Sequence, residues 1–447
     1  MDRKVFRLLG FMATVVTSIN ARNIDVPRYG VNKREAKVAF DDKLHHELKR
    51  SYPQSTHAQL TVLKQELERV LEPPNFSASI VPRWPTPAAA PVNNNALKTL
   101  PTLERKTLTD LYRSMGGPDW HLKDGWMSAS NPCGDDGTTN KASWFGVDCT
   151  TFEISSKGGF TLHVTRLLLP HNNLVGKLPA LRNLQHLLHL DFSGERSPEV
   201  SNDYVNSVGG TLDALCGLSN LSTVLLTGNN LTGSIPDCIQ SLTNAMVLYL
   251  DFNNIHGTTP DELCHLHNQK ELHLRGNHLH GTVPVCFGED LTALRMLDYS
   301  NIHRDHSFGN QSLSGTIPAS LCDLELLEIL KFQATQGLHG TLPDCLGTKQ
   351  PKLKKLALEM NQFEGPIPEN ICQANALEGL YLDENVLTGT LPGCLGSLSQ
   401  LTFLELSDNR FRGPVSRDLC QASALEHLIL SKNALTGTIP SCLGSLR

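Results

Sequence analysis

Long hydrophobic runs are missing from this chain of 447 residues. The apolar run at residues 8–16 is well below the ~20 apolar residues that a membrane-spanning helix needs. It follows a basic start at residues 3–7, and Ser18 or Ala21 offers a small residue for cleavage. We therefore predict a secretory signal peptide over residues 1–21 and no transmembrane helix. An ordinary N-terminal helix or an uncleaved anchor is the alternative.

Aromatic residues and catalytic motifs are also scarce. Only 6% of the residues are Phe, Trp or Tyr. The sequence has no nucleophile elbow, phosphate-binding loop, HExxH motif or recognisable carboxylate pair, and no CxxC pair of the kind that holds zinc. His256 and His280 share a repeat position, but that position holds Thr232 in another repeat. We therefore expect a protein that is not an enzyme and has no cofactor and no metal site.

Positive charge is in short supply from residue 103 onward. The chain has a net charge of −6, and residues 103–447 hold 24 Lys and Arg against 36 Asp and Glu. Nucleic-acid phosphates would be repelled by such a surface, so we expect no nucleic-acid partner. Residues 22–72 are polar with one predicted amphipathic helix, and residues 73–102 form a Pro-rich linker.

A repeat of about 24 residues fills the rest of the chain. Residues 377–400, 401–424 and 425–447 align on LxxLxLxxNxLxGxIPxxLxxL, and the frame recurs back to residue 164. A period in the twenties with this frame is the signature of leucine-rich repeats, of which the sequence holds about eleven.

Each part of the repeat has a physical role. LxxLxL places alternate leucines inward on a short strand, and strands of successive units stack in parallel ~4.8 Å apart. The buried Asn satisfies backbone groups, the Gly permits a turn, and Ile-Pro fixes an extended kink. We predict an α/β fold: a curved leucine-rich-repeat solenoid with a parallel sheet on the concave face and short helical segments on the convex face.

Ten cysteines alternate between two positions of the repeat frame, just before and just after the apolar residue of the convex segment. If that residue points inward, its two neighbours point toward opposite coils. One pairing register then uses all ten, whereas the other leaves Cys216 and Cys442 unpaired. Buried free cysteine is the alternative, although strict alternation and an even count favour disulfides. The expected pairs are Cys216–Cys238, Cys264–Cys286, Cys322–Cys345, Cys372–Cys394 and Cys420–Cys442.

Two motifs carry a resemblance to a known family. LTGxIP, at residues 231–236 and 435–440, is specific to plant-type extracellular leucine-rich repeats. Upstream, GGPDW and WFGVDC resemble the N-terminal cap of receptor-like proteins, receptor-like kinase ectodomains and polygalacturonase inhibitors. The resemblance covers residues 103–447. It implies a cap over residues 103–163, with Cys133 paired to Cys149, and repeats over residues 164–447.

The chain departs from that family in three ways. Residues 194–208 and 301–312 are insertions, and Asp213 and Ser416 replace the frame proline. The chain also ends at Arg447 inside a repeat, so a truncated product is one interpretation of this sequence. Sequons that predict glycosylation lie at Asn75, Asn220, Asn230 and Asn310.

The outward positions of the strands predict where a ligand binds, because only they vary without cost to the core. Aromatic residues at these positions, here Tyr249, Tyr381 and Phe403, are a type enriched at binding hot spots. We expect these three to be exposed. The predicted binding residues on the concave face are Tyr249, Asp251, His273, Arg275, Glu359, Tyr381, Asp383, Phe403 and Glu405.

Two functions from different classes fit this sequence. The first is a secreted or cell-surface recognition module that binds a protein, peptide or wall glycan, as the receptor family implies. The second is an inhibitor of an extracellular hydrolase, as the polygalacturonase inhibitors imply. A truncated ectodomain of a receptor kinase is a third interpretation, and neither ligand nor oligomeric state follows from the residues.

Overall fold

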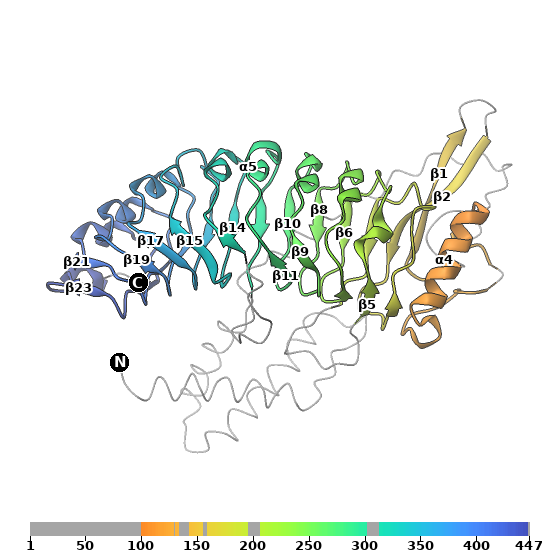
Figure 1. The fold of residues 1–447 in the computed structure, drawn as a ribbon, viewed down its shortest axis with the longest axis horizontal. Helices are drawn as coiled ribbons and strands as arrows, with labels where there is room; N and C mark the ends of the chain where they lie inside the picture. The colour runs from red at the N-terminus through yellow and green to blue at the C-terminus, as the bar shows by residue number, and fades with distance from the viewer. Residues whose placement is uncertain are drawn as a thin grey trace, which may run out of the picture. The chain divides into compact units, whose positions relative to one another are not determined.

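A computed structural model describes residues 100–128, 130–133, 143–154, 159–194, 206–301 and 313–445. The predicted signal segment, the polar segment, nearly all of the linker and the sequons at Asn75 and Asn310 lie outside these residues. The described part forms a curved solenoid, shown along its length in Figure 1. Across these ranges, no helix is both long enough and apolar enough to cross a bilayer.

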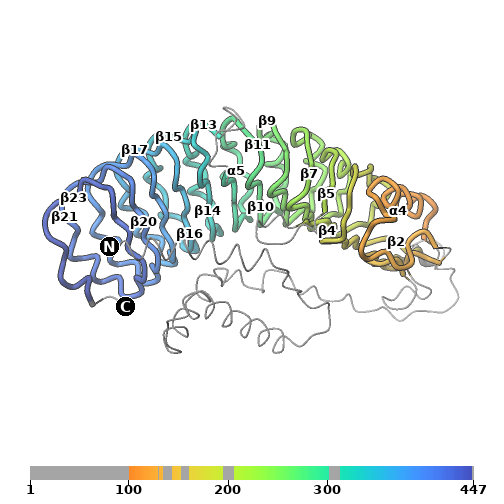
Figure 2. The backbone as a smooth tube through the Cα atoms, turned by 90° about the horizontal axis from the view of Figure 1, so that it is seen from below, coloured from red at the N-terminus to blue at the C-terminus, as the bar shows by residue number. Residues whose placement is uncertain are grey.

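One sheet of twelve strands runs along the solenoid. Its first two strands are antiparallel, and every later strand pairs in parallel with the next coil. Figure 2 shows this sheet on the inner side of the curve, so the predicted solenoid with a concave parallel sheet is confirmed. The strands are β1 (Val147–Ile154), β2 (Gly159–Leu168), β4 (His189–Asp191), β6 (Thr223–Leu225), β8 (Val247–Tyr249), β10 (Glu271–His273), β12 (Met296–Asp298), β14 (Ile329–Lys331), β16 (Lys355–Ala357), β18 (Gly379–Tyr381), β20 (Phe403–Glu405) and β22 (His427–Ile429).

Short helical segments return each coil on the convex side, as predicted. Most are single 3-10 turns that begin directly after the frame proline, whose fixed φ suits the start of a helix. The described helical segments are α4 (Thr102–Ser114), η1 (Gly117–Asp119), η3 (Leu212–Leu215), η4 (Asp237–Ser241), η5 (Asp261–His265), α5 (Cys286–Asp290), η7 (Ala319–Asp323), η8 (Glu369–Gln373), η9 (Gly393–Ser397), η10 (Arg417–Gln421) and η11 (Ser441–Ser445).

Smaller parallel sheets lie beside the main one, and the sequence analysis did not foresee them. They form where the chain runs extended between the recurring Asn of the repeat frame, which we call the ladder asparagine, and the Ile-Pro pair. The frame glycine lies here with positive φ, +80° at Gly233, and a Cβ at that glycine would meet the Thr211 methyl at 3.1 Å. The strands are β3 (Val175–Lys177), β5 (Ser207–Gly210), β7 (Asn230–Leu231), β9 (His256–Thr258), β11 (His278–His280), β13 (Ser314–Gly315), β15 (Gly337–Thr341), β17 (Gln362–Gly365), β19 (Val386–Leu387), β21 (Arg412–Pro414) and β23 (Ala434–Thr436).

Buried asparagines join each coil to the next, as the repeat predicted. The Asn253 amide nitrogen donates to the Leu226 and Leu250 carbonyls at 2.9 and 3.0 Å, and its oxygen accepts from the Leu231 N–H at 3.0 Å. Asn206, inside an expected insertion, takes the same role and is fully buried. In one coil Thr335 stands in this position and donates to the Asn361 side chain.

All six predicted disulfides are present. The five repeat pairs bring Cα atoms to 5.4–5.9 Å across neighbouring coils, and Cys133 and Cys149 are 5.5 Å apart, inside the usual range for a bridge. The repeat disulfides therefore link neighbouring coils covalently on the convex side, and the main sheet links them by hydrogen bonds on the concave side.

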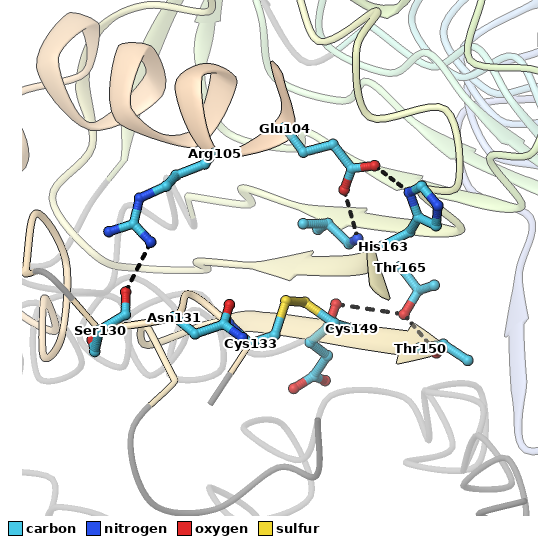
Figure 3. The surroundings of a disulfide bond; sticks show 11 residues. Glu104, Arg105, Ser130, Asn131, Cys133, Cys149, Thr150, His163 and Thr165 are labelled. Carbon is cyan, nitrogen blue, oxygen red and sulfur yellow. Dashed lines mark hydrogen bonds and ion pairs between the residues drawn. A yellow bond between two sulfur atoms is a disulfide. The ribbon is translucent and has the colours of Figure 1, made fainter. Parts of the chain in front are cut away.

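The cap closes the first coil with aromatic and polar contacts. The Trp120 ring packs edge-on against Tyr112 at 5.1 Å and Trp126 at 4.9 Å. Figure 3 shows two side chains from α4 that reach the strands and the disulfide loop. Glu104 accepts a hydrogen bond from the Val164 N–H at 2.9 Å, and Arg105 donates to the Ser130 carbonyl at 3.0 Å.

Candidate ligand-binding site

Three rows of side chains project from the main sheet toward the inside of the curve. The first row comes from the first residue of each short strand, the second row from its third residue, and the third row from two residues later. For β18 the three positions are Gly379, which has no side chain, Tyr381, and Asp383 just after the strand, while Leu380 and Leu382 between them are fully buried. The strand register places row members of adjacent coils side by side.

The four predicted binding residues nearest the N-terminus already contact one another and their neighbours. They are Tyr249, Asp251, His273 and Arg275. Tyr249 stacks on His273 with 4.0 Å between ring centroids and donates to the Glu271 carboxylate. Asp251 is 6% exposed and accepts from the Arg275 N–H at 2.9 Å. The expectation that Tyr249 is exposed is wrong, because the neighbouring histidine ring covers one of its faces. Asp251 thus has a structural role in the turn.

Arg275 and His273 nevertheless keep unused polar groups. The Arg275 guanidinium lies 5.3 Å from the Phe252 ring centroid. The Arg275 Nε and the His273 Nε2 are buried without a hydrogen-bond partner. Buried polar atoms of this kind call for an explanation, and a bound polar group is one.

Two lysines that were not among the predicted binding residues lie in the middle of the face. The Lys331 Nζ is 3.3 Å from the Asp298 Oδ2, with both side chains nearly buried. Although burial favours the protonated acid, Lys331 and hydrogen bonds from Ser300 hold the pKa of Asp298 below its usual range. The Lys355 Nζ lies 4.4 Å from the Tyr381 ring centroid. Burial, with Lys331 nearby, lowers the pKa of Lys355.

An aromatic row continues from Lys355 toward the C-terminal end. The Tyr381 and Phe403 rings stack at 6.2 Å and 24°, and the Phe403 and His427 rings stack at 4.4 Å and 9°. Phe403 is 37% exposed and Ile429 39%. Tyr381 is half-buried, so the expectation that it is exposed is wrong. Lys355 and Phe403 flank its ring from the two neighbouring coils.

Three carboxylates lie beside this aromatic row. Glu359 and Asp383 occupy the third row in adjacent coils, and Glu405 is in the second row of the next coil. The Glu359 Oε2 and the Asp383 Oδ1 are buried without a hydrogen-bond partner. Burial, together with Asp383, raises the pKa of Glu359 to about 7. Burial and Glu405 raise the pKa of Asp383 to about 7.

The face therefore divides into two parts. The structure brings Glu359, Tyr381, Asp383, Phe403 and Glu405 together as one cluster at the C-terminal end, while Tyr249 and Asp251 are several coils away and occupied. Lys331 and Lys355 were missed as candidates because single charges at outward positions look like solvated surface. Only the structure shows that Lys331 is nearly buried and Lys355 half-buried, on a diagonal between neighbouring strands.

Two further groups of residues concern the predicted glycosylation and the expected absence of a metal site. Asn220 and Asn230, two of the predicted glycosylation sites, are exposed. Two groups of potential metal ligands occur among the described residues, Asp213 with Cys216 and Cys238, and Asp290 with Cys264 and Cys286. In both groups the two sulfurs are bonded to each other, so neither offers thiolates to a metal.

Comparisons with known proteins agree with the repeat architecture. Leucine-rich-repeat family models match residues 219–279 and 424–446. Receptor-like protein 53 of Arabidopsis thaliana is 31% identical over 96 residues, which is 22% of this chain and 10% of that protein.

Solved structures give longer matches. The plant peptide hormone receptor RGFR1, solved in complex with RGF2, matches 61% of this chain and 40% of its own at 30% identity and a TM-score of 0.54. The PEPR1–AtPEP1 structure matches 77% of this chain and 47% of its own at 28% identity and a TM-score of 0.59.

The matched regions thus span about a tenth of the curated relative and less than half of each receptor structure. Repeat signature, disulfide ladder and these similarities agree with one another. Over the matched regions, the chain is similar to plant leucine-rich-repeat proteins, among them receptor-like proteins and receptor ectodomains.

Proposed function

We propose that this protein is a non-catalytic recognition module that binds a peptide or a protein segment on its concave sheet. The observation that carries the proposal is the cluster at the C-terminal end, where an exposed aromatic residue adjoins half-buried carboxylates with unpartnered oxygens. The similarity to a plant peptide hormone receptor supports it. Six disulfides favour an oxidising compartment, so we also propose a secreted or cell-surface location.

The stacked aromatic row favours a peptide over a wall glycan. A sugar ring stacks on the open face of an aromatic ring. Here His427 covers one face of Phe403 at 4.4 Å, and Tyr381 lies 6.2 Å away in the same row, which leaves little room for a sugar ring to stack. The ring edges remain, and they suit the apolar side chains and backbone groups of a peptide.

Replacing Tyr381 and Phe403 together by Ala should weaken ligand binding by about 2 kcal/mol or more, roughly thirtyfold in Kd. The fold should survive, because both side chains are outside the buried leucine frame. Calorimetry with a ligand isolated from extracellular fluid measures the affinity, and circular dichroism measures the fold. The matched control is Val285→Ala, which removes an exposed apolar side chain on the convex side. Normal binding by the double variant, or loss of binding by the control, would contradict the concave assignment.

Ligand affinity should also depend on pH. Glu359 and Asp383 hold protons up to about pH 7 in the free protein, whereas the unfolded chain releases them near pH 4. Their contribution to stability is therefore present at low pH and lost as pH rises through 7. A cationic ligand group needs the ionised carboxylates, so its affinity should rise from pH 5.5 to 8.

Calorimetry at several pH values tests this linkage. The Asp383→Asn variant should bind with a flatter pH profile, because one of the two titrating groups is gone. Asp344→Asn, which alters a carboxylate next to the convex disulfide ladder, serves as the control and should keep the original slope. Equal slopes in the protein and in Asp383→Asn would show that the carboxylate pair does not contact the ligand.

A further inference from the structure

Opposite charges are sorted along the concave face and do not neutralise each other. We define the cationic patch as Arg275, Lys331 and Lys355, and the acidic patch as Glu359, Asp383 and Glu405. Asp298 offsets one charge of the cationic patch through its contact with Lys331. Within the described part of the chain, no ion pair joins the two patches, and Lys355 forms no ion pair at all.

The register explains why the patches remain separate. Lys355 is the first residue of β16 and Glu359 lies four residues later in the same coil, so their Cα atoms are roughly 13 Å apart along an extended chain. The Lys355 ammonium lies over the Tyr381 ring, and it interacts with Glu359 only at long range, without an ion pair. Each patch therefore keeps unneutralised charge that a ligand can meet.

Unpartnered buried atoms occur in both patches. The Arg275 Nε belongs to the cationic patch, and the Glu359 Oε2 and Asp383 Oδ1 belong to the acidic patch. The cationic atom is a donor that suits an anionic ligand group, and the two acidic atoms are acceptors that suit a cationic one. Charge complementarity thus specifies both ends of the ligand.

Strand spacing sets the distance between these ends. Lys355 in β16 and Asp383 after β18 are one strand apart, about 5 Å, and four residues apart along the strand direction, about 13 Å. The diagonal between the two backbone positions is roughly 14 Å, which about four residues of an extended peptide span at ~3.3 Å each.

We propose that the segment bound here carries an acidic residue three or four positions from a basic residue, with an apolar side chain beyond the basic one. The acidic residue lies over the cationic patch, the basic residue over the acidic patch, and the apolar side chain against Phe403 and Ile429. This inference rests on the proposed function and specifies its ligand as a peptide of mixed charge in a fixed order.

The test is a selection of random dodecapeptides displayed on phage against the full chain, at low salt and pH 8. Enriched peptides should hold Asp or Glu three or four residues from Lys or Arg. One such peptide, labelled with a fluorophore, should bind Lys355→Glu at least about tenfold more weakly than the original protein. Lys355→Met, which introduces no new charge, is the second variant in case Lys355→Glu fails to fold. Lys352→Glu makes the same charge change at an exposed site outside the sheet and should bind normally.

A double-mutant cycle then tests whether the acidic residue of the peptide contacts Lys355. Replacing the acidic residue of the peptide by Ala should weaken binding to the original protein but hardly affect binding to Lys355→Met. Enriched peptides of a single charge sign, or additive effects in the cycle, would overturn the charge order. Peptides that bind Tyr381→Ala/Phe403→Ala unchanged would overturn the proposed function itself, and a library without binders would contradict both.

Discussion

Replacing Asn385 by Ala should lower the free energy of unfolding by about 3–5 kcal/mol. The side chain is 6% exposed, and its amide donates to the Leu358 and Leu382 carbonyls at 3.0 and 3.1 Å. Its oxygen accepts from the Phe363 N–H at 3.0 Å. Alanine leaves the Phe363 N–H buried without a partner, which costs about 1–3 kcal/mol. It also removes the two bonds to the carbonyls, at about 0.5–1.5 kcal/mol each, although the Leu358 and Leu382 carbonyls still accept from Asn361 and Asn409.

The backbone turn before this residue adds to the expected loss. Glu384 has φ +51°, a left-handed conformation that costs energy for a residue with a Cβ. The same turn recurs before Asn253, Asn361, Asn409 and Asn433, so the ladder asparagine is what stabilises it across coils. Without Asn385 the turn loses its main anchor to the preceding coil.

Urea unfolding followed by circular dichroism gives the change in stability, and hydrogen exchange shows whether coils on both sides open together. Asn375→Ala is the matched control, because Asn375 is exposed in the same repeat and should change stability by less than about 0.5 kcal/mol. Equal stability of Asn385→Ala and Asn375→Ala would show that the buried asparagines do not stabilise the packing of neighbouring coils.

Sequence alone predicted the features that repeat with the frame. The inward leucines, ladder asparagines and alternating cysteines each recur at one position, so a single physical interpretation applies to every coil. Asn206 was missed because an insertion moved it out of the frame. Its side chain nevertheless donates to a backbone carbonyl of the preceding coil, as that of Asn229 does. The lateral strands were missed because their positions carry mixed residues, such as His256 and Arg412, with no two-residue alternation.

The candidate site was predictable only in part. Outward positions follow from strand alternation, which located Tyr381, Phe403 and the carboxylates correctly on one face. Whether an outward side chain is exposed depends on its neighbours in adjacent coils, which are 23 to 34 residues away in the sequence. For that reason Tyr249 was expected to be open, although His273 covers it. Lys355 looked like ordinary surface charge, although it lies over Tyr381.

The cap depends on a single buried carboxylate in the same way that the coils depend on asparagine. Glu104 of α4 is 3% exposed. Its Oε2 accepts from the Val164 N–H at 2.9 Å, and its Oε1 is 2.5 Å from the His163 Nδ1. Both partners belong to β2, the strand that starts the parallel part of the sheet. Glu104 therefore joins the cap helix directly to the first coil.

Replacing Glu104 by Ala should cost about 2–4 kcal/mol of cap stability, because the Val164 N–H and the His163 ring nitrogen lose a buried acceptor. The Cys133–Cys149 bridge keeps β1 in place beside Val164, so the change should loosen α4 while later coils stay folded. Hydrogen exchange should therefore speed up in α4 and β2 and remain unchanged beyond β6. Asp110→Ala is the control on the same helix, since Asp110 makes only an exposed contact with Lys106 and should cost about 1 kcal/mol or less. Exchange rates in α4 that are equal in the two variants would show that the helix is held by its apolar contacts alone, without the Glu104 bond to β2.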